Sequence, residues 1–171
     1  GQVSCWGAAT DFWDVSSLTA VVEIGAGNQH GCAVLASGHV SCWGRNDSGQ
    51  LGDGTTSDAY QPVEVVGIES AVDVTLGFEN SCALLADGQV LCWGENYSGQ
   101  LGDGTQVSRP TAAAVVGLDV ALEVDAGDAH NCAIRGTGQV VCWGDNGSKQ
   151  LGDGTSEDRA TPVPVDYGPY L

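Results

Sequence analysis

The sequence contains no methionine and only five lysine and arginine residues against 22 aspartate and glutamate residues, for a formal net charge of −17. Nucleic-acid phosphates and anionic membrane surfaces are bound by basic side chains, so we expect neither as a partner. The acidic surface favours solubility instead. Because Gly1 is not a start residue, we interpret the chain as a processed protein or a piece of a longer one.

Long apolar segments and helical periodicity are also missing. No apolar run approaches the roughly 18 residues of a membrane span, and no basic, apolar leader opens the chain, so we expect no membrane insertion. Apolar and polar residues instead alternate in short segments such as "AVDV" at 71–74, the period-2 pattern of a strand with one buried face. The pattern therefore predicts an all-β chain, and 171 residues fit one repeat domain over residues 1–171.

What the sequence does have is an internal repeat of 50 residues. The repeated positions include two cysteines and the tryptophan that follows the second of them: Cys32, Cys82 and Cys132; Cys42, Cys92 and Cys142; Trp43, Trp93 and Trp143. Three or four short strands in each repeat of this length are typical of the blades of a β-propeller. We divide the chain into an incomplete blade, three repeats and a divergent tail: 1–17; 18–67, 68–117 and 118–165; 166–171.

The two cysteines of each repeat flank a predicted hairpin. In "CALLADGQVLCWG" the last loop residue is Gly88, which suits a three-residue loop that needs a positive φ there. Counting outward from this loop puts Cys82 opposite Cys92, where Cβ atoms lie about 4.5–5.5 Å apart, close to disulfide range. The same count predicts the pairs Cys32–Cys42 and Cys132–Cys142. A zinc site or a reduced pair is the alternative, but zinc ligands come in close C-x-x-C groups.

The full repeat, "G-x-x-H-x-C-A-(L/V)", a hairpin and "C-W-G-x-N-x-x-G-Q-L-G-D-G-T", resembles the regulator of chromosome condensation repeat family over residues 18–165, and most closely its cysteine-bearing, exported bacterial branch. The resemblance implies four-stranded antiparallel blades in a ring of commonly seven. This chain would form a partial propeller of about three blades plus fragments. It departs from the pattern at Asn80, in place of His, and at Lys149, in place of Gly.

The seventh cysteine, Cys5, occupies the position of a second hairpin cysteine whose partner would precede Gly1. Two explanations remain open. The chain is a fragment of a longer propeller, or copies associate as paired half-rings or as a filament. An odd cysteine in an exported chain is expected at an intermolecular link, so Cys5 is our candidate for one.

Two further sets of repeated residues are candidates for sites. The tryptophans Trp43, Trp93 and Trp143 are expected to pack in the blade core rather than to bind a ligand, because they recur identically in every repeat. The asparagines Asn46, Asn96 and Asn146 each match the N-x-S acceptor pattern for glycosylation. The alternative for these asparagines is that each holds a turn through its side chain.

No pattern indicates catalysis. The histidines His30, His39 and His130 form no repeated constellation with an acid and a nucleophile, and no phosphate-binding glycine loop is present. The "LGDGT" turns supply one aspartate each, too few for a calcium loop. We therefore expect no catalytic residue, no metal site, no cofactor and no enzymatic activity.

Oxidised cysteine pairs imply an exported protein, so we expect it outside the cell or at the cell surface. Our first functional prediction is a non-enzymatic, disulfide-stapled scaffold that works by assembling with copies of itself. The alternative is a propeller module of a larger secreted protein that binds another protein or a glycan. The acidic charge and the cystines oppose the nuclear exchange-factor role of some members of the family that the sequence resembles.

Overall fold

The computed structural model describes residues 15, 17–166 and 168. These residues form three four-stranded antiparallel sheets, each one a propeller blade. Blade 1 comprises β1 (Val21–Ala26), β2 (His30–Leu35), β3 (Val40–Gly44) and β4 (Ala59–Glu64). Blade 2 comprises β5 (Ala71–Leu76), β6 (Asn80–Leu85), β7 (Val90–Gly94) and β8 (Arg109–Ala114). Blade 3 comprises β9 (Ala121–Ala126), β10 (His130–Arg135), β11 (Val140–Gly144) and β12 (Arg159–Pro164).

The strands of every blade pair in chain order, so each blade is a simple meander. The predicted hairpin is present, with Gly88 at φ +85° and with Cys82 directly opposite Cys92. The first strand of each blade carries an irregularity one residue after its start, between Val21 and Glu23 in β1. The all-β fold and the four-stranded blades predicted from the sequence are confirmed.

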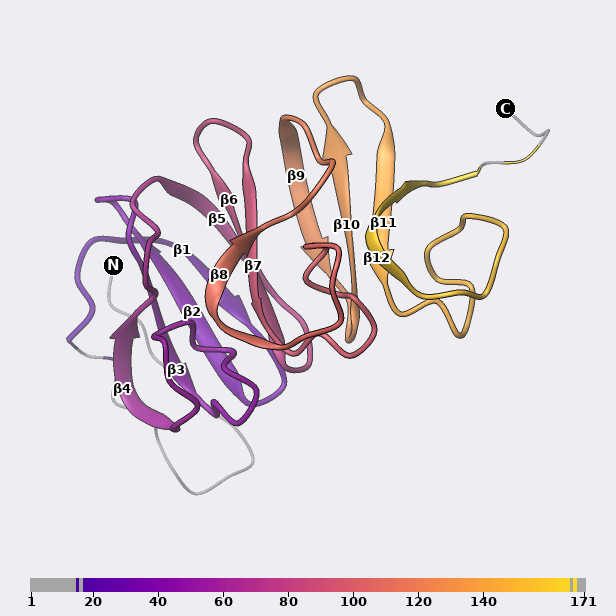
Figure 1. The fold of residues 1–171 in the computed structure, drawn as a ribbon. Helices are drawn as coiled ribbons and strands as arrows, with labels where there is room; N and C mark the ends of the chain where they lie inside the picture. Colours follow the sequence, from indigo (N-terminus) through magenta and orange to yellow (C-terminus); the bar gives the residue numbers. More distant parts are fainter. Residues whose placement is uncertain (1–14, 16, 167, 169–171) are drawn as a thin grey trace.

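The three blades follow one another across the molecule in chain order, as the colour sequence in Figure 1 shows. Their cores lie between neighbouring sheets rather than within one sheet, because each strand presents alternate side chains to the blade on either side. Among the described residues, no helix is long and apolar enough to cross a membrane.

Candidate functional site

Each blade has two different faces, and their pairing makes the blade junctions. We call the face that bears the disulfide the cystine face; in blade 1 it consists of Cys32, Val34, Val40 and Cys42. We call the opposite face the tryptophan face; in blade 2 it consists of Val74, Ala83 and Trp93. The alternation follows from the strand period of two, since Cys92 and Trp93 are neighbours in sequence and point to opposite sides.

The two junctions between the three described blades use the same pairing. The cystine face of blade 1 packs on the tryptophan face of blade 2 in one apolar cluster. The cystine face of blade 2 packs likewise on blade 3, where Ala133 and Trp143 fill the equivalent places. Both tryptophans are fully buried. Trp93 and Trp143, two of the three predicted blade-core tryptophans, therefore lie at the junctions, where each packs one blade against the preceding one.

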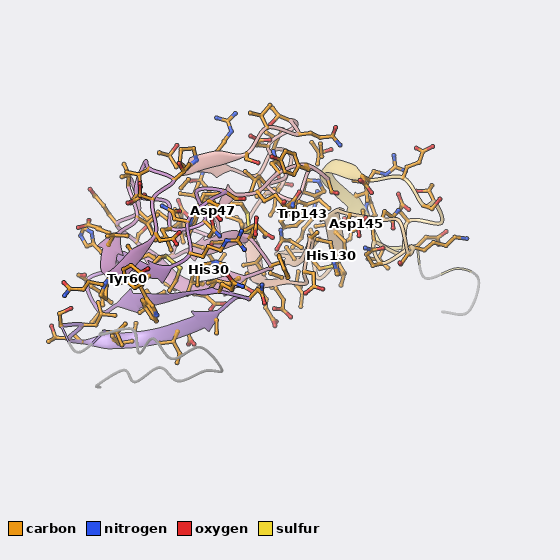
Figure 2. The ribbon with its side chains drawn as sticks, turned by 90° about the horizontal axis from the view of Figure 1, so that it is seen from below. His30, Asp47, Tyr60, His130, Trp143 and Asp145 are labelled. Atoms are coloured by element: carbon orange, nitrogen blue, oxygen red, sulfur yellow. A yellow bond between two sulfur atoms is a disulfide. The ribbon has the colours of Figure 1, made fainter. Side chains whose placement is uncertain are left out.

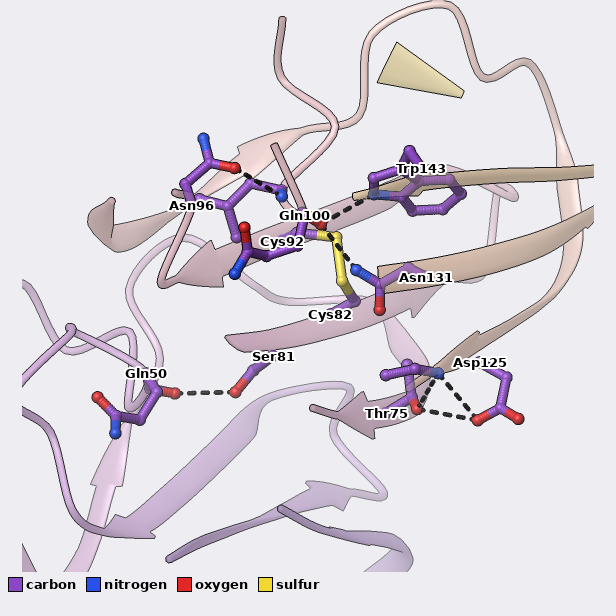
Figure 3. The surroundings of a disulfide bond; sticks show 12 residues. Gln50, Thr75, Ser81, Cys82, Cys92, Asn96, Gln100, Asp125, Asn131 and Trp143 are labelled. Atoms are coloured by element: carbon purple, nitrogen blue, oxygen red, sulfur yellow. Dashed lines mark hydrogen bonds between the residues drawn. A yellow bond between two sulfur atoms is a disulfide. The ribbon is translucent and has the colours of Figure 1, made fainter. Parts of the chain in front are cut away.

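At both junctions a backbone carbonyl of the preceding blade accepts a hydrogen bond from the buried indole. Trp93 donates its Nε1–H to the Gln50 oxygen at 2.8 Å, and Trp143 donates to the Gln100 oxygen at 2.9 Å. The Gln100 oxygen also accepts from Asn131 Nδ2 at 2.7 Å, as Figure 3 shows beside the Cys82–Cys92 disulfide. These bonds satisfy polar groups that the junction removes from water.

A histidine reinforces the first junction. His30 Nε2 lies 2.9 Å from Ser81 Oγ, and the Ser81 hydroxyl donates to the Gln50 oxygen at 2.9 Å. The hydroxyl proton is thus used, so the imidazole N–H donates to Ser81. Burial lowers the pKa of His30 to about 4, which keeps the ring neutral. At the second junction Asn80 takes this place, and both polar atoms of its side chain lack a hydrogen-bond partner.

The cystine face of blade 3 is not covered by another blade of the described chain. Its residues His130, Cys132, Ile134, Val140 and Val165 are half-buried. Their equivalents in blades 1 and 2 are buried against the following blade. We call this surface the free face of blade 3.

The opposite end of the blade series is different. On the tryptophan face of blade 1, Ala33 and Trp43 are buried beneath Val15 and Leu18. These two residues correspond in the repeat to Val65 and Ile68, which pack across the first junction.

All three disulfides join the pairs expected from the hairpin: Cys32–Cys42, Cys82–Cys92 and Cys132–Cys142. The first two lie inside junctions, whereas Cys132 reaches the free face. Such pairs indicate an oxidising environment. Cys5 lies outside the described residues, so its role as an intermolecular cysteine stays a prediction.

The three asparagines of the N-x-S pattern are fully buried: Asn46, Asn96 and Asn146. The Asn96 amide nitrogen donates to oxygens of Asp103, Thr105 and Val107 at 3.2 Å, and its Oδ1 accepts from the Leu101 N–H at 2.9 Å. Asn46 and Asn146 make the same set of bonds. The geometry favours the turn-holding alternative over glycosylation, because the acceptor nitrogen is enclosed and already bonded.

The aspartates of the "LGDGT" turns are engaged in the same loops. Asp103 accepts from the Thr105 N–H and hydroxyl and from Arg109 Nε at 2.6 Å. Burial raises the pKa of Asp103, but these hydrogen bonds outweigh it and the pKa falls below its usual range. In the described part of the chain no three His, Cys, Asp or Glu side chains could hold a metal ion together.

The histidines are dispersed. His30 and His130 lie in different blades, as Figure 2 shows, and His39 pairs with Glu64 at 2.8 Å on the surface.

Comparisons with known proteins agree with this architecture. The family model described as the Regulator of chromosome condensation (RCC1) repeat matches residues 21–50, 71–100 and 122–150, and a second model of the same description matches 37–84 and 87–134. The chain belongs to the regulator of chromosome condensation repeat family. Its three disulfides fit a cysteine-bearing branch of that family.

The relatives are similar in sequence over about one repeat and in structure over 88–89% of this chain. The human Regulator of chromosome condensation is 42% identical over 53 residues, 31% of this chain and 13% of that protein. The Ultraviolet-B receptor UVR8 of Arabidopsis thaliana is 41% identical over 49 residues, 29% of this chain and 11% of that protein.

The structure of Prp20p from Saccharomyces cerevisiae superposes with a TM-score of 0.79 at 20% identity, covering 88% of this chain and 39% of that one. Human WBSCR16 gives a TM-score of 0.76 at 22% identity, covering 89% and 38%. The chain thus spans less than two fifths of these solved relatives.

Sequence reasoning missed the carbonyl acceptors of this repeat. Gln50 and Gln100 act through their backbone oxygens, which no side-chain pattern reveals. The available signal was the fixed spacing between the "GQLG" turn of one repeat and the tryptophan of the next.

Proposed function

We propose that the chain is a non-enzymatic, extracellular, disulfide-stapled propeller scaffold that assembles with copies of itself through blade faces. The observation that carries this proposal is the free face of blade 3. Apolar residues that are buried in two equivalent junctions are half-exposed there. Burying such a surface is favourable at about 25 cal/mol per Å² of apolar area.

A second copy is the occupant that we propose. Blade 3 keeps the groups that receive a tryptophan face, namely the Gln150 carbonyl and the apolar side chains beside Leu151. The surface therefore suits a further blade of the same repeat. In a second copy the tryptophan faces of blades 2 and 3 are taken up by internal junctions, which leaves blade 1, whose tryptophan face lies beneath Val15 and Leu18, as the blade that would dock. Paired half-rings or a filament would follow, depending on whether the rotation between copies closes.

Native mass across a concentration series, first non-reduced and then reduced, tests this proposal. We expect a multimer in the non-reduced sample. A multimer that persists on reduction would place the association in the blade faces, whereas one that falls to monomers on reduction would point to a Cys5 link and count against the blade faces. A monomer at every concentration would overturn self-assembly.

A second candidate is a propeller module of a larger secreted protein that binds another protein or a glycan. It is supported by the chain spanning only 38–39% of its solved relatives. The solved structure of Prp20p is reported together with its binding to Gsp1p and histones, so for this candidate we favour a protein partner over a glycan. It predicts that the natural protein is longer and that its additional sequence contains the same 50-residue pattern.

A further inference from the structure

The third and fourth strands of each blade are joined by a long loop, residues 45–58 in blade 1 and 95–108 in blade 2. One glycine in each of these two loops permits a close approach between blades. Gly49 and Gly99 both have φ +81° and both are buried. A Cβ on Gly49 would lie 2.5 Å from the Cα of Pro110, and one on Gly99 would lie 2.5 Å from the Cα of Ala160. These contacts are with backbone in β8 and β12, the outer strands of the following blades. Glycine is therefore required by the position of the next outer strand as well as by the turn.

The third repeat has Lys149 at this position. Its φ is +64°, which is uncommon for a residue with a side chain, and it is exposed. The turn itself is unchanged, since the Lys149 N–H bonds the Asn146 oxygen at 2.9 Å as Gly99 bonds Asn96 at 3.0 Å. The departure is at the position where, in blades 1 and 2, a Cβ would collide with the backbone of the following outer strand.

The other junction glycines of blade 3 are retained. Gly152 and Gly154 keep φ of +64° and +78°, close to Gly102 and Gly104 in blade 2. In the internal junctions the Gly54 N–H donates to the Pro110 oxygen and the Gly104 N–H to the Ala160 oxygen, both at 2.9 Å. Blade 3 thus keeps the glycine backbone conformations found at the internal junctions and differs at Lys149, the position of closest approach.

We propose that Lys149 prevents a blade from docking on the free face of blade 3 with its outer strand in the place that it takes at the two internal junctions. A second copy then docks with its outer strand displaced, so the junction between copies is the weakest of the assembly and opens first. We call this junction between copies the seam. The inference rests on the self-assembly proposed above.

The steric claim is tested inside one chain with Gly99→Ala and its matched control Gly104→Ala. Both residues have φ near +80°, but a Cβ at Gly104 would have no neighbour nearer than 4.0 Å. We expect Gly99→Ala to open the junction between blades 2 and 3 and to speed reduction of Cys82–Cys92, measured by thiol alkylation, about tenfold more than Gly104→Ala does. Equal rates in the two variants would overturn the steric claim.

The seam is tested with Lys149→Gly and Lys149→Ala in sedimentation equilibrium. Lys149→Gly removes the Cβ and should tighten self-association by about tenfold or more. Lys149→Ala keeps the Cβ and should associate as the native chain does. If both variants tighten association equally, the long charged side chain and not the Cβ is responsible, and the seam as proposed is wrong. If all three proteins are monomers, the self-assembly fails, while the comparison of the two glycine variants still decides the steric claim.

Discussion

One asparagine side chain organises the long loop of each blade. Its amide nitrogen and its oxygen hydrogen-bond different parts of the loop at the same time. In blade 2, Asn96 Nδ2 donates to Asp103 and Val107, and Asn96 Oδ1 accepts from the Leu101 N–H. A buried side chain that satisfies so many backbone groups holds a loop without secondary structure in one conformation. The residue that matched a glycosylation pattern is in this account a structural one.

Asn96→Asp tests this role with almost no change of shape. The new carboxylate oxygen would face the oxygens of Asp103, Thr105 and Val107, so we expect the free energy of unfolding to fall by about 3 kcal/mol. Denaturant unfolding followed by tryptophan fluorescence measures this fall. Asn28→Asp, at an exposed turn position, is the control and should change stability little. A loss no larger than that of the control would contradict the role.

Glycosylation of the three asparagines is the competing prediction. We expect protein from a glycosylating host to show no added mass in sugar-sized steps, because each acceptor nitrogen is enclosed in the folded loop. Intact mass spectrometry decides it. A folded protein carrying a glycan on Asn46, Asn96 or Asn146 would refute the turn-holding account.

His30 should make stability depend on pH. Its pKa is about 4 in the folded state and 6.5 in the unfolded state, so above pH 6.5 both states are neutral and the histidine adds no dependence. As the pH falls from 6.5 to 4, His30 binds a proton in the unfolded state but not in the folded state. The free energy of unfolding therefore falls by about 3 kcal/mol because of this one residue. Unfolding free energies over this range measure the slope. His30→Asn, which installs the residue of the second repeat, should remove that part of it, and an unchanged slope would contradict the assignment.

At the scale of elements, the hairpins were predictable and the junctions only in part. Period-2 alternation and a loop ending in Gly88 were enough to place Cys82 opposite Cys92, because hairpin register is fixed locally. The contacts across a junction join residues about 30 to 50 positions apart, and the fixed spacing of the repeat shows that the same positions recur but not which of their atoms meet. The bonds of Ser81 and Trp93 to the Gln50 oxygen therefore emerged only from the structure.

The three disulfides close loops of the same length, so a chain-entropy estimate gives each about 3 kcal/mol. They differ in access, because Cys132 is half-buried on the free face whereas Cys32 and Cys82 are fully buried. We expect a mild reductant to open Cys132–Cys142 first in the monomer, as mapped by alkylation and peptide mass spectrometry. Simultaneous loss of all three, or loss of Cys82–Cys92 first, would contradict the distinction between free and internal faces.

For the whole molecule, electrostatic repulsion between copies opposes the self-association that the apolar blade faces favour. Two copies with a net charge of −17 each repel one another, and this repulsion is screened within about 10 Å at 0.1 M salt and about 3 Å at 1 M. We therefore expect self-association to tighten as sodium chloride rises from 0.05 to about 0.5 M. Light scattering at fixed protein concentration measures it. Association that weakens with salt would indicate contacts between opposite charges rather than apolar faces.

If the free face of blade 3 carries the assembly, a charge placed at Ile134 should abolish it. Sedimentation equilibrium would compare Ile134→Glu with the control Val66→Glu, which lies on an exposed turn between blades 1 and 2. Both would be made in a Cys5→Ser background, so that only non-covalent contacts are measured. We expect multimers for the background and for Val66→Glu, and a folded monomer for Ile134→Glu. A multimeric Ile134→Glu, or a monomeric background, would contradict this expectation.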